Sequence, residues 1–240
     1  MLKILGLSLY GPLAASTRYR LEQYIPGLSE YGIDLQVHHL LGDEYLRCRF
    51  QNKQLPFSAL IRAACKRLAL LLRDQEFDAV ILYAEIFPFL PGWLERKLIR
   101  KPYIYDFDDA FYLKYKRGKL GLLQPLLGKK VQQIIAGASA VTAGNKRLLG
   151  YAKTVNNNSF LLPTVVDIER YRPKKPTFLS STFTVGWIGS PSTASYLAAV
   201  VHPLSILGLE GSVRLVVVGG TAPVIPHVEV VEEEWQEELQ

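Results

Sequence analysis

The stretch YIYDFDDAFY, at Tyr103–Tyr112, decides the fold class because an apolar run ends abruptly in three carboxylates. Strands with acids at their C-terminal ends are typical of α/β proteins, which place polar chemistry at the mouth of a crevice there. Strand alternation predicts Asp106 and Asp108 on one face and Asp109 on the other. Since the three carboxylates repel one another, a positive ligand, a nearby Lys or Arg, or a shifted pKa must compensate.

Two interpretations of these acids remain open from the residues alone. Asp108 or Asp109 could cap a helix by accepting hydrogen bonds from its first backbone N–H groups. Alternatively, Asp108 and Asp109 are candidate catalytic residues at the end of a buried strand. The rest of the chain favours the second interpretation.

Strand and helix patterns alternate over about the first 165 residues, as expected for parallel βαβ units and a doubly wound sheet. Strands are predicted at Leu2–Leu9, Ile33–Leu40, Asp78–Tyr83, Tyr103–Phe107, Ser139–Thr142 and Ser159–Leu162. Helices are predicted at Ser16–Leu28 with Ser16 or Thr17 as the cap, at Pro56–Arg73, at Leu120–Gly137, and from Asn145 to Tyr151. In the second helix the i, i+3, i+4 rule predicts one apolar face, formed by Leu60, Ile61, Ala64, Leu68, Leu71 and Leu72.

The composition changes at the segment RYRPKKPTFLSST, which is typical of a linker. Beyond it, strands are predicted at Thr184–Ile188, Val213–Val218 and Val228–Val231, with a helix from about Thr193 to Leu207 and an acidic helix from Glu232. We therefore expect an N-terminal Rossmann-like domain over 1–172, a linker over 173–182 and the beginning of a second Rossmann-like domain over 183–240. Three strands are too few to shield a parallel sheet, so we expect the chain to stop within that domain.

The overall composition is that of a globular protein, with 49% apolar and 21% charged residues. No apolar run reaches the roughly 18 residues that span a bilayer, and the start of the chain makes a poor signal peptide. The two cysteines, Cys48 and Cys65, have neither redox nor metal-binding spacing. These features predict a reduced, cytoplasmic protein.

Charge divides the chain into two parts. Residues 1–180 carry 27 basic and 15 acidic residues, a net charge of +12, whereas residues 181–240 carry one basic and seven acidic residues, a net charge of −6. A basic unit could face phosphates, an anionic membrane or nucleic acid, or its charges could only solvate the surface. No nucleic-acid motif accompanies the basic run Lys114–Lys119. We therefore expect no nucleic acid, and peripheral contact with an anionic membrane through this run and the basic helix around Arg62 and Lys66.

The segment GSPS, at Gly189–Ser192, follows a predicted strand and opens a helix. Gly189 allows close backbone approach, Ser190 offers a hydroxyl, and a helix N-terminus offers free N–H groups, a combination suited to a pyrophosphate. The alternative is a plain turn with Ser192 as the helix cap. The segment is neither a Walker loop nor a GxGxxG fingerprint. On the first unit the matching loop contains Gly11, and Arg18 beyond it could bind an anionic acceptor.

Metal and hydrolase chemistry find no support in the sequence. His38 and His39 point to opposite faces of a strand, and no HExxH or CxxC motif is present, so we predict no metal site. No Gly-x-Ser-x-Gly elbow is present, which argues against a serine hydrolase.

An ordered series of segments extends over almost the whole chain: the first glycine loop, YDFDDAFY, SAVTAGNKRLLGYA, LLPTVVDIERYRP, TVGWIGSPSTASYL and LVVVGG. This series resembles the GT-B glycosyltransferases of family 4, a retaining, nucleotide-sugar-dependent group. The resemblance implies two Rossmann-like domains across a cleft, the first binding a sugar or lipid-linked acceptor and the second a nucleotide diphosphate sugar. It implies no metal and no cofactor besides this donor substrate.

Site residues follow from the resemblance by position. Gly11 would lie under the transferred sugar, Asn145 would follow a turn at the cleft, and Gly189 and Ser190 would cradle the donor phosphates. Asp108 departs from the family pattern, because many relatives carry a histidine in that place. A carboxylate there could accept hydrogen bonds from sugar hydroxyls.

The family's donor-site cation and its pair of glutamates have no counterpart in the chain. No basic residue lies between Lys175 and Arg214, and the glutamates would be expected beyond Gln240. Whether these 240 residues act as an enzyme is therefore open, and the alternative is an inactive binding module. A nicotinamide-dependent Rossmann protein is a third hypothesis, against which the missing GxGxxG argues.

Overall fold

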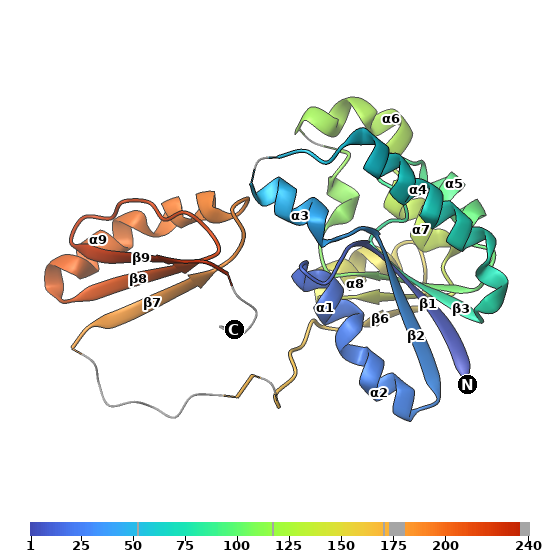
Figure 1. The fold of residues 1–240 in the computed structure, drawn as a ribbon, viewed down its shortest axis with the longest axis horizontal. Coiled ribbons are helices and arrows are strands. Elements are labelled where there is room, and N and C mark those ends of the chain that lie inside the picture. Colours follow the sequence, from blue (N-terminus) through green and yellow to red (C-terminus); the bar gives the residue numbers. More distant parts are fainter. Residues whose placement is uncertain (52, 117, 170, 173–180, 236–240) are drawn as a thin grey trace. The chain divides into compact units, whose positions relative to one another are not determined.

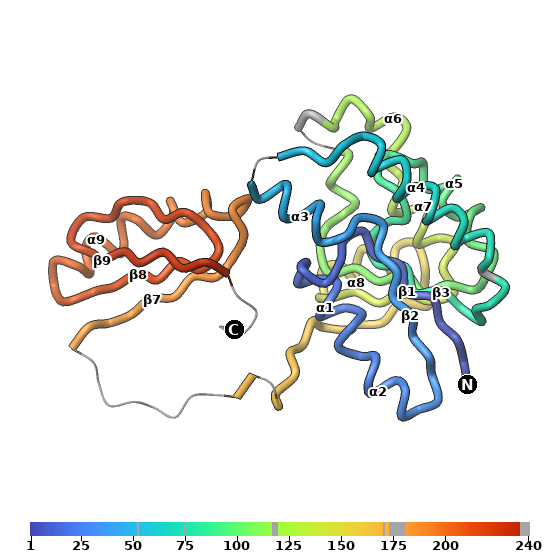
Figure 2. Tube along the Cα trace, viewed as in Figure 1, coloured from blue at the N-terminus to red at the C-terminus, as the bar shows by residue number. Residues whose placement is uncertain are grey.

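The computed structural model describes residues 1–51, 53–116, 118–169, 171–172 and 181–235. The chain divides into two compact units, Met1–Asp167 and Ile168–Gln240, whose traces are shown in Figures 1 and 2. The boundary predicted after residue 172 lies near this division, and most of the predicted linker, residues 173–180, is outside the described residues.

The N-terminal unit is built on a six-stranded sheet with the strand order β2-β1-β3-β4-β5-β6. Its strands are β1 (Leu2–Tyr10), β2 (Ile33–Leu41), β3 (Ala79–Tyr83), β4 (Tyr103–Phe107), β5 (Ala140–Ala143) and β6 (Ser159–Leu161). All neighbouring pairs are parallel, and Tyr83, Asp106 and Thr142 lie in register across β3, β4 and β5. The carboxyl ends of all six strands therefore meet at one edge of the sheet.

Helices cover the sheet as expected for parallel crossovers. The β1–β2 connection holds α1 (Ala15–Arg20), η1 (Glu22–Tyr24) and α2 (Ile25–Glu30), and the β2–β3 connection holds α3 (Asp43–Phe50), α4 (Phe57–Leu72) and η2 (Asp74–Glu76). The later connections hold α5 (Gly92–Leu98), η3 (Phe111–Leu113), η4 (Gly118–Leu123), α6 (Gln124–Leu127), α7 (Lys130–Gly137) and α8 (Lys146–Lys153). Right-handed crossovers place α1 and α2 on one face and α4, α5, α7 and α8 on the other.

The main core lies between the sheet and this second group of helices. Strand side chains with no exposed surface, such as Leu82 and Tyr105, pack with Ile134 and Ile135 of α7. A smaller cluster on the opposite face contains Leu21 and Tyr83. Apolar strands buried on both faces explain why β1, β3 and β4 have nearly continuous hydrophobic sequences.

The single helix predicted at Ser16–Leu28 is wrong. Leu21 leaves the helical conformation (φ −129°, ψ −62°), and Pro26 lies in the first turn of α2, so the segment divides into three short helices. Neither Ser16 nor Thr17 caps α1, because Ala14 holds the N-cap position without a side-chain hydrogen bond. Thr17 instead donates to the Tyr10 carbonyl (2.8 Å) and so fastens α1 to the end of β1.

Helix α4 forms where predicted, but its packing face differs from the prediction. Leu71 and Arg67 are buried, whereas Ile61, Leu68 and Leu72 are exposed. Arg67 lies on the buried face of α4, where its Nη2 donates to the carbonyls of Ser8 (2.8 Å) and His38 (3.0 Å). These bonds between α4 and two strands could not be inferred from helical periodicity.

The structure also departs from the other helix predictions. The predicted helix at Leu120–Gly137 is split among η4, α6 and α7, and glycine and proline at Gly121, Pro125 and Gly128 account for the breaks. Helices α3 and α5 were not predicted. Asn145 does open α8, where its side chain accepts from the Leu148 N–H (3.0 Å).

The C-terminal unit contains a three-stranded parallel sheet of order β7-β8-β9, formed by β7 (Phe183–Ile188), β8 (Val213–Val218) and β9 (Val228–Glu233). Its β7–β8 connection begins as a 3-10 helix, η5 (Ala194–Val200), and continues as α9 (Val201–Glu210). Leu204 of α9 packs on Leu215 and Val217 of β8. The acidic helix predicted from Glu232 is wrong at its start, because Glu232 and Glu233 belong to β9; residues 236–240 lie outside the described part.

Candidate functional site

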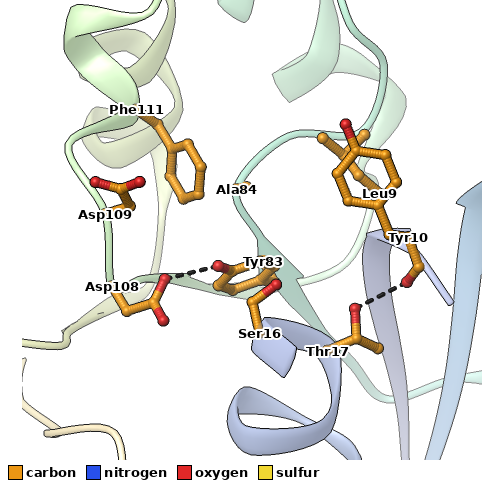
Figure 3. A pocket seen from close by; sticks show the side chains of 9 residues that line it. All are labelled: Leu9, Tyr10, Ser16, Thr17, Tyr83, Ala84, Asp108, Asp109 and Phe111. Atoms are coloured by element: carbon orange, nitrogen blue, oxygen red, sulfur yellow. Dashed lines mark hydrogen bonds between the residues drawn. The ribbon is translucent and has the colours of Figure 1, made fainter. Parts of the chain in front are cut away.

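A pocket of about 400 Å³ lies at the carboxyl ends of β1, β3 and β4 (Figure 3). It is lined by Leu9, Tyr10, Ser16, Thr17, Tyr83, Ala84, Asp108, Asp109 and Phe111. The parallel register brings these side chains together from segments that are far apart in the sequence, from Leu9 to Phe111. Sequence reasoning singled out both acids of this pocket but not its aromatic side chains.

Asp108 is held by a phenol. Tyr83, the last residue of β3, donates its hydroxyl to Asp108 Oδ1 (2.6 Å), as Figure 3 shows. Burial raises the pKa of the Tyr83 phenol above its ordinary value, and the Asp108 carboxylate raises it further. Tyr83 therefore remains a protonated donor at neutral pH, and it orients one oxygen of the carboxylate.

The compensating charge for the acidic segment is Arg20, at the end of α1. Its Nε donates to Asp106 Oδ2 (2.9 Å) and its Nη2 pairs with Asp106 Oδ1, while Nη1 donates to the Leu162 carbonyl (2.7 Å). Burial raises the pKa of Asp106, and the hydrogen bonds from Arg20 and Thr142 oppose that rise. Asp106 is therefore a structural partner that ties α1, β4, β5 and the segment after β6 together, and Arg20 was not singled out from the sequence.

Asp109 lies at the exposed rim of the pocket. Its Oδ1 accepts from the Ala110 N–H (2.7 Å), and its carbonyl accepts from the Phe111 N–H (2.8 Å). The helix that follows, η3, has no side-chain cap. The helix-cap alternative for Asp108 and Asp109 is therefore wrong for η3, and both carboxylates face the pocket (Figure 3).

The pocket wall at Ala84 has an unusual backbone. Ala84 has φ +66°, in the left-handed region that non-glycine residues rarely adopt. The next residue, Glu85, binds Lys130 Nζ through Oε2 (2.6 Å), and Lys130 is also 2.9 Å from Glu95 Oε1. Lys130 and Glu95 are almost completely buried, and the contacts of Lys130 with Glu85 and Glu95 hold the β3–α5 loop against the core.

Asn145 lies close to the same edge of the sheet. It is exposed at the N-cap of α8, directly after Gly144. A Cβ on Gly144 would lie 2.8 Å from both Cα and Cβ of Asp108, so the β5–α8 turn packs directly against the pocket acid. Asn145 thus follows a turn that packs against Asp108, although Asn145 itself does not line the pocket.

The first loop places Gly11 and Arg18 beside the pocket rather than in its lining. Gly11 is buried, and a Cβ there would lie 2.5 Å from Asp43 Oδ1. Asp43, the first residue of α3, accepts from the Leu13 N–H (2.9 Å) and so holds the loop. Arg18 Nη1 donates to the Pro12 carbonyl (2.6 Å), an interaction that also supports this loop.

In the C-terminal unit, Gly189 and Ser190 follow β7. A Cβ on Gly189 would lie 2.5 Å from the Trp187 ring, and Gly189 donates its N–H to the Val218 carbonyl (3.1 Å). Ser190 Oγ is 2.8 Å from Ser192 Oγ, and the Ser190 N–H donates to Thr193 Oγ1 (3.2 Å). The turn thus gathers three hydroxyl groups at the carboxyl edge of the smaller sheet. Ser192 does not cap the following helix, whose N-cap is Thr193.

Metal-binding clusters and membrane-spanning helices are both absent from the described residues. No group of three or more His, Cys, Asp and Glu side chains in the described ranges is arranged to hold a metal ion. No helix within the part of the chain that the structure describes has both the length and the apolar character to cross a bilayer.

The sequence matches no family model and no curated protein. The structure is similar to the sucrose-phosphate synthase (tll1590) from Thermosynechococcus elongatus, with a TM-score of 0.58 at 12% identity, over 93% of this chain and 63% of that one. It is also similar to S. aureus MnaA in a UDP co-structure, with a TM-score of 0.53 at 14% identity, over 97% of this chain and 69% of that one. The chain thus spans less than two thirds of the length of the first of these proteins.

The fold is of the GT-B type. The predicted fold class is confirmed, with a Rossmann-like parallel sheet followed by a second, smaller parallel sheet. The structural similarity, at identities of 12% and 14%, shows the fold alone, so the reaction must be argued from the residues of the site.

Proposed function

We propose that the chain takes part in glycosyl transfer from a nucleotide diphosphate sugar, with retention of configuration as in the family-4 glycosyltransferases. The observation that carries the proposal is the acidic pocket at the carboxyl edge of the six-stranded sheet, formed on a GT-B fold. In open α/β sheets, ligands bind outside the carboxyl ends of the strands. The UDP in the MnaA co-structure supports a nucleotide ligand for this fold.

The acids of the pocket are suited to polyhydroxylated ligands. Asp108 and Asp109 are acceptors, so they can receive hydrogen bonds from sugar hydroxyls. Because Tyr83 donates to one oxygen of Asp108, the other oxygen is the one proposed to accept from a ligand hydroxyl. In this proposal both carboxylates position the reacting sugar and acceptor, with Asn145 and Gly11 supporting the adjacent loops.

The hydroxyl-rich turn of the C-terminal unit is the proposed diphosphate site. At Gly189 the Trp187 ring takes the place of a Cβ, so the turn requires glycine there, and Ser190 supplies a hydroxyl donor beside those of Ser192 and Thr193. Hydrogen bonds to a developing diphosphate charge would stabilise the leaving group. No metal or other cofactor is invoked.

The acceptor is proposed to be a sugar or a lipid-linked molecule held by the N-terminal unit, with Arg18 near an anionic group of it. A cytoplasmic protein with peripheral contact with an anionic membrane would meet such an acceptor at the membrane surface. The chain's basic N-terminal part, with a net charge of +12 over residues 1–180, supports this location.

Ligand-dependent thermal melting tests the proposal. UDP, GDP and ADP, each with and without an attached sugar, should be compared at matched concentrations. A ligand present at 100 times its Kd stabilises the native state by about 2.7 kcal/mol. Release of nucleoside diphosphate from the effective sugar donor would then show turnover, whereas binding without turnover would favour the inactive binding module.

Two glycines of β7 and its turn supply a matched pair of variants. Gly189→Ala places a Cβ 2.5 Å from the Trp187 ring and should abolish the ligand-dependent shift, whereas a Cβ on Gly186 meets nothing within 4 Å. Ser190→Ala removes only a hydroxyl and separates ligand loss from misfolding. If Gly189→Ala, Ser190→Ala and wild type all shift equally, the proposed diphosphate site is wrong.

A further inference from the structure

Helix α4 exposes an apolar stripe to solvent. Phe57 is 76% exposed, Ile61 50%, Leu68 40% and Leu72 71%. Their spacings of four, seven and four residues place them along one side of the helix. A stripe of large apolar side chains on a helix of a soluble unit marks an interaction surface.

A row of cations accompanies this stripe. Arg62 and Lys66 are exposed on α4 and Arg73 follows its last residue, and the sequence of α4 contains no Asp or Glu. The three cations also line a groove of about 710 Å³ between α4 and the edge strand β2, where Glu44 and Glu76 are the acidic residues. The cations lie on the groove side of α4, roughly 130° around the helix axis from the stripe, and none of the four stripe residues lines the groove. The stripe on one exposed flank and the cation row on the other are together called the α4 outer face.

A buried cation strengthens the positive potential under this face. Arg67 is 3% exposed, it donates through Nη2 to two backbone carbonyls, and its Nη1 has no hydrogen-bond partner among the described residues. None of its hydrogen bonds involves a carboxylate. The positive charge of Arg67 lowers the pKa of His38 on β2, secondarily to burial. The groove thus combines exposed and buried cations.

We propose that the α4 outer face docks on a lipid bilayer that contains anionic lipids. Apolar side chains on one flank and basic ones on the other, on a helix of only 16 residues, are the pattern of a helix that lies in the bilayer interface. The cations complement anionic headgroups, and each contributes to attraction near such a surface. A second copy of the chain fits less well, because a two-fold contact would bring two cationic faces together.

This surface deepens the proposed function, on which it rests for the membrane contact, by locating that contact on α4, and the course of the chain relates it to the pocket. Strand β2 runs to the carboxyl edge of the sheet, α3 follows there, and α4 returns toward the start of β3 (Figure 1). Phe57, the first residue of α4, is therefore at the end of the helix nearer to the edge that carries Asp108.

Vesicle co-sedimentation tests the proposal with the full chain and no nucleotide sugar, so its result is independent of glycosyl transfer. Vesicles of pure phosphatidylcholine are compared with an equimolar mixture of phosphatidylcholine and phosphatidylglycerol. We expect binding only to the mixture, weakened by added salt. Lys66→Glu should weaken partitioning about fivefold or more, and Phe57→Ser about tenfold.

Matched controls separate the α4 outer face from general surface properties. Lys153→Glu on α8 makes the same charge change, and Tyr31→Ser removes an 83% exposed aromatic residue before β2. Both controls should bind as wild type does. Binding to neither vesicle, equal binding to both, or equal losses in the controls would overturn the proposal. So would a dimer, seen by light scattering, that Phe57→Ser dissociates.

Discussion

Replacement of Lys130 by Met tests the buried cluster beneath the pocket wall. The ammonium donates to Glu85 Oε2 and the Phe87 carbonyl, both at 2.6 Å, and is 2.9 Å from Glu95 Oε1. The side chains of Lys130, Glu85 and Glu95 are 1%, 6% and 0% exposed. Methionine fills a similar volume but leaves two carboxylates without this cation.

The expected loss follows from what the carboxylates retain. Removal of one partner from a buried ion pair destabilises a protein by about 3–5 kcal/mol. Glu85 keeps Lys114 and the Tyr115 hydroxyl, and Glu95 keeps the N–H groups of Ile86 and Phe87. We therefore expect Lys130→Met to lower the free energy of unfolding by about 3 kcal/mol, the lower end of that range. Because 1.36 kcal/mol corresponds to a factor of ten, the buried amides should exchange about a hundredfold faster.

The destabilisation should depend on pH. In the wild type, burial alone would raise the pKa of Glu85, but Lys130 and Lys114 hold it below its ordinary value. That contribution is present above the unfolded pKa and is lost as pH falls through the folded one. Without Lys130 the pKa of Glu85 and that of Glu95, which burial already raises, both move upward. The variant should therefore lose most stability at neutral pH, and the difference from wild type should narrow toward about pH 4.

Hydrogen exchange of the buried amides of β3 and β4 is the assay, because it reports on the N-terminal unit alone. Lys129→Met is the matched control: Lys129 is the exposed neighbour, and its loss should change the free energy of unfolding by less than about 0.5 kcal/mol. Equal exchange in Lys130→Met and Lys129→Met, or a difference that does not vary with pH, would refute the reasoning.

Three further predictions concern the pocket. Arg20→Met leaves Asp106 buried without its cation and should lower the free energy of unfolding by about 3–5 kcal/mol in urea titrations; Arg20→Lys should recover only part, because the bidentate contact is lost. Gly144→Ala forces a Cβ to 2.8 Å from the backbone of Asp108 and should reduce donor turnover about tenfold or more while nucleotide binding persists. Tyr83→Phe removes the donor to Asp108, and a turnover loss below about tenfold would contradict its orienting role.

Local patterns predicted the parallel architecture correctly. Each buried strand of the N-terminal unit is a short apolar run, and each is followed by a segment with helical periodicity or turn residues. Parallel pairing requires such crossovers, so the alternation itself indicates the sheet type. The helix start near Asn145 and the acids at the end of β4 were also predicted, because both depend on residues a few positions apart.

Local patterns failed where distant partners decide the outcome. Periodicity alone predicted a purely apolar inner face for α4, but Arg67 takes an inward position by bonding to carbonyls of β1 and β2. The Thr17 hydroxyl fastens α1 to Tyr10 instead of capping it. In both cases a long-range hydrogen bond outweighs a weak local preference.

For the pocket, the sequence by itself determined which residue types arrive at the carboxyl edge: three carboxylates within and just after the end of β4, and a glycine-containing loop after β1. Only the tertiary structure decided their separate roles. Arg20, 86 positions away in the sequence, neutralises Asp106, while Tyr83 orients Asp108 and leaves it facing the pocket. The physical reason is that charge compensation depends on distances of a few ångströms, which strand order and crossover geometry set and no sequence spacing encodes.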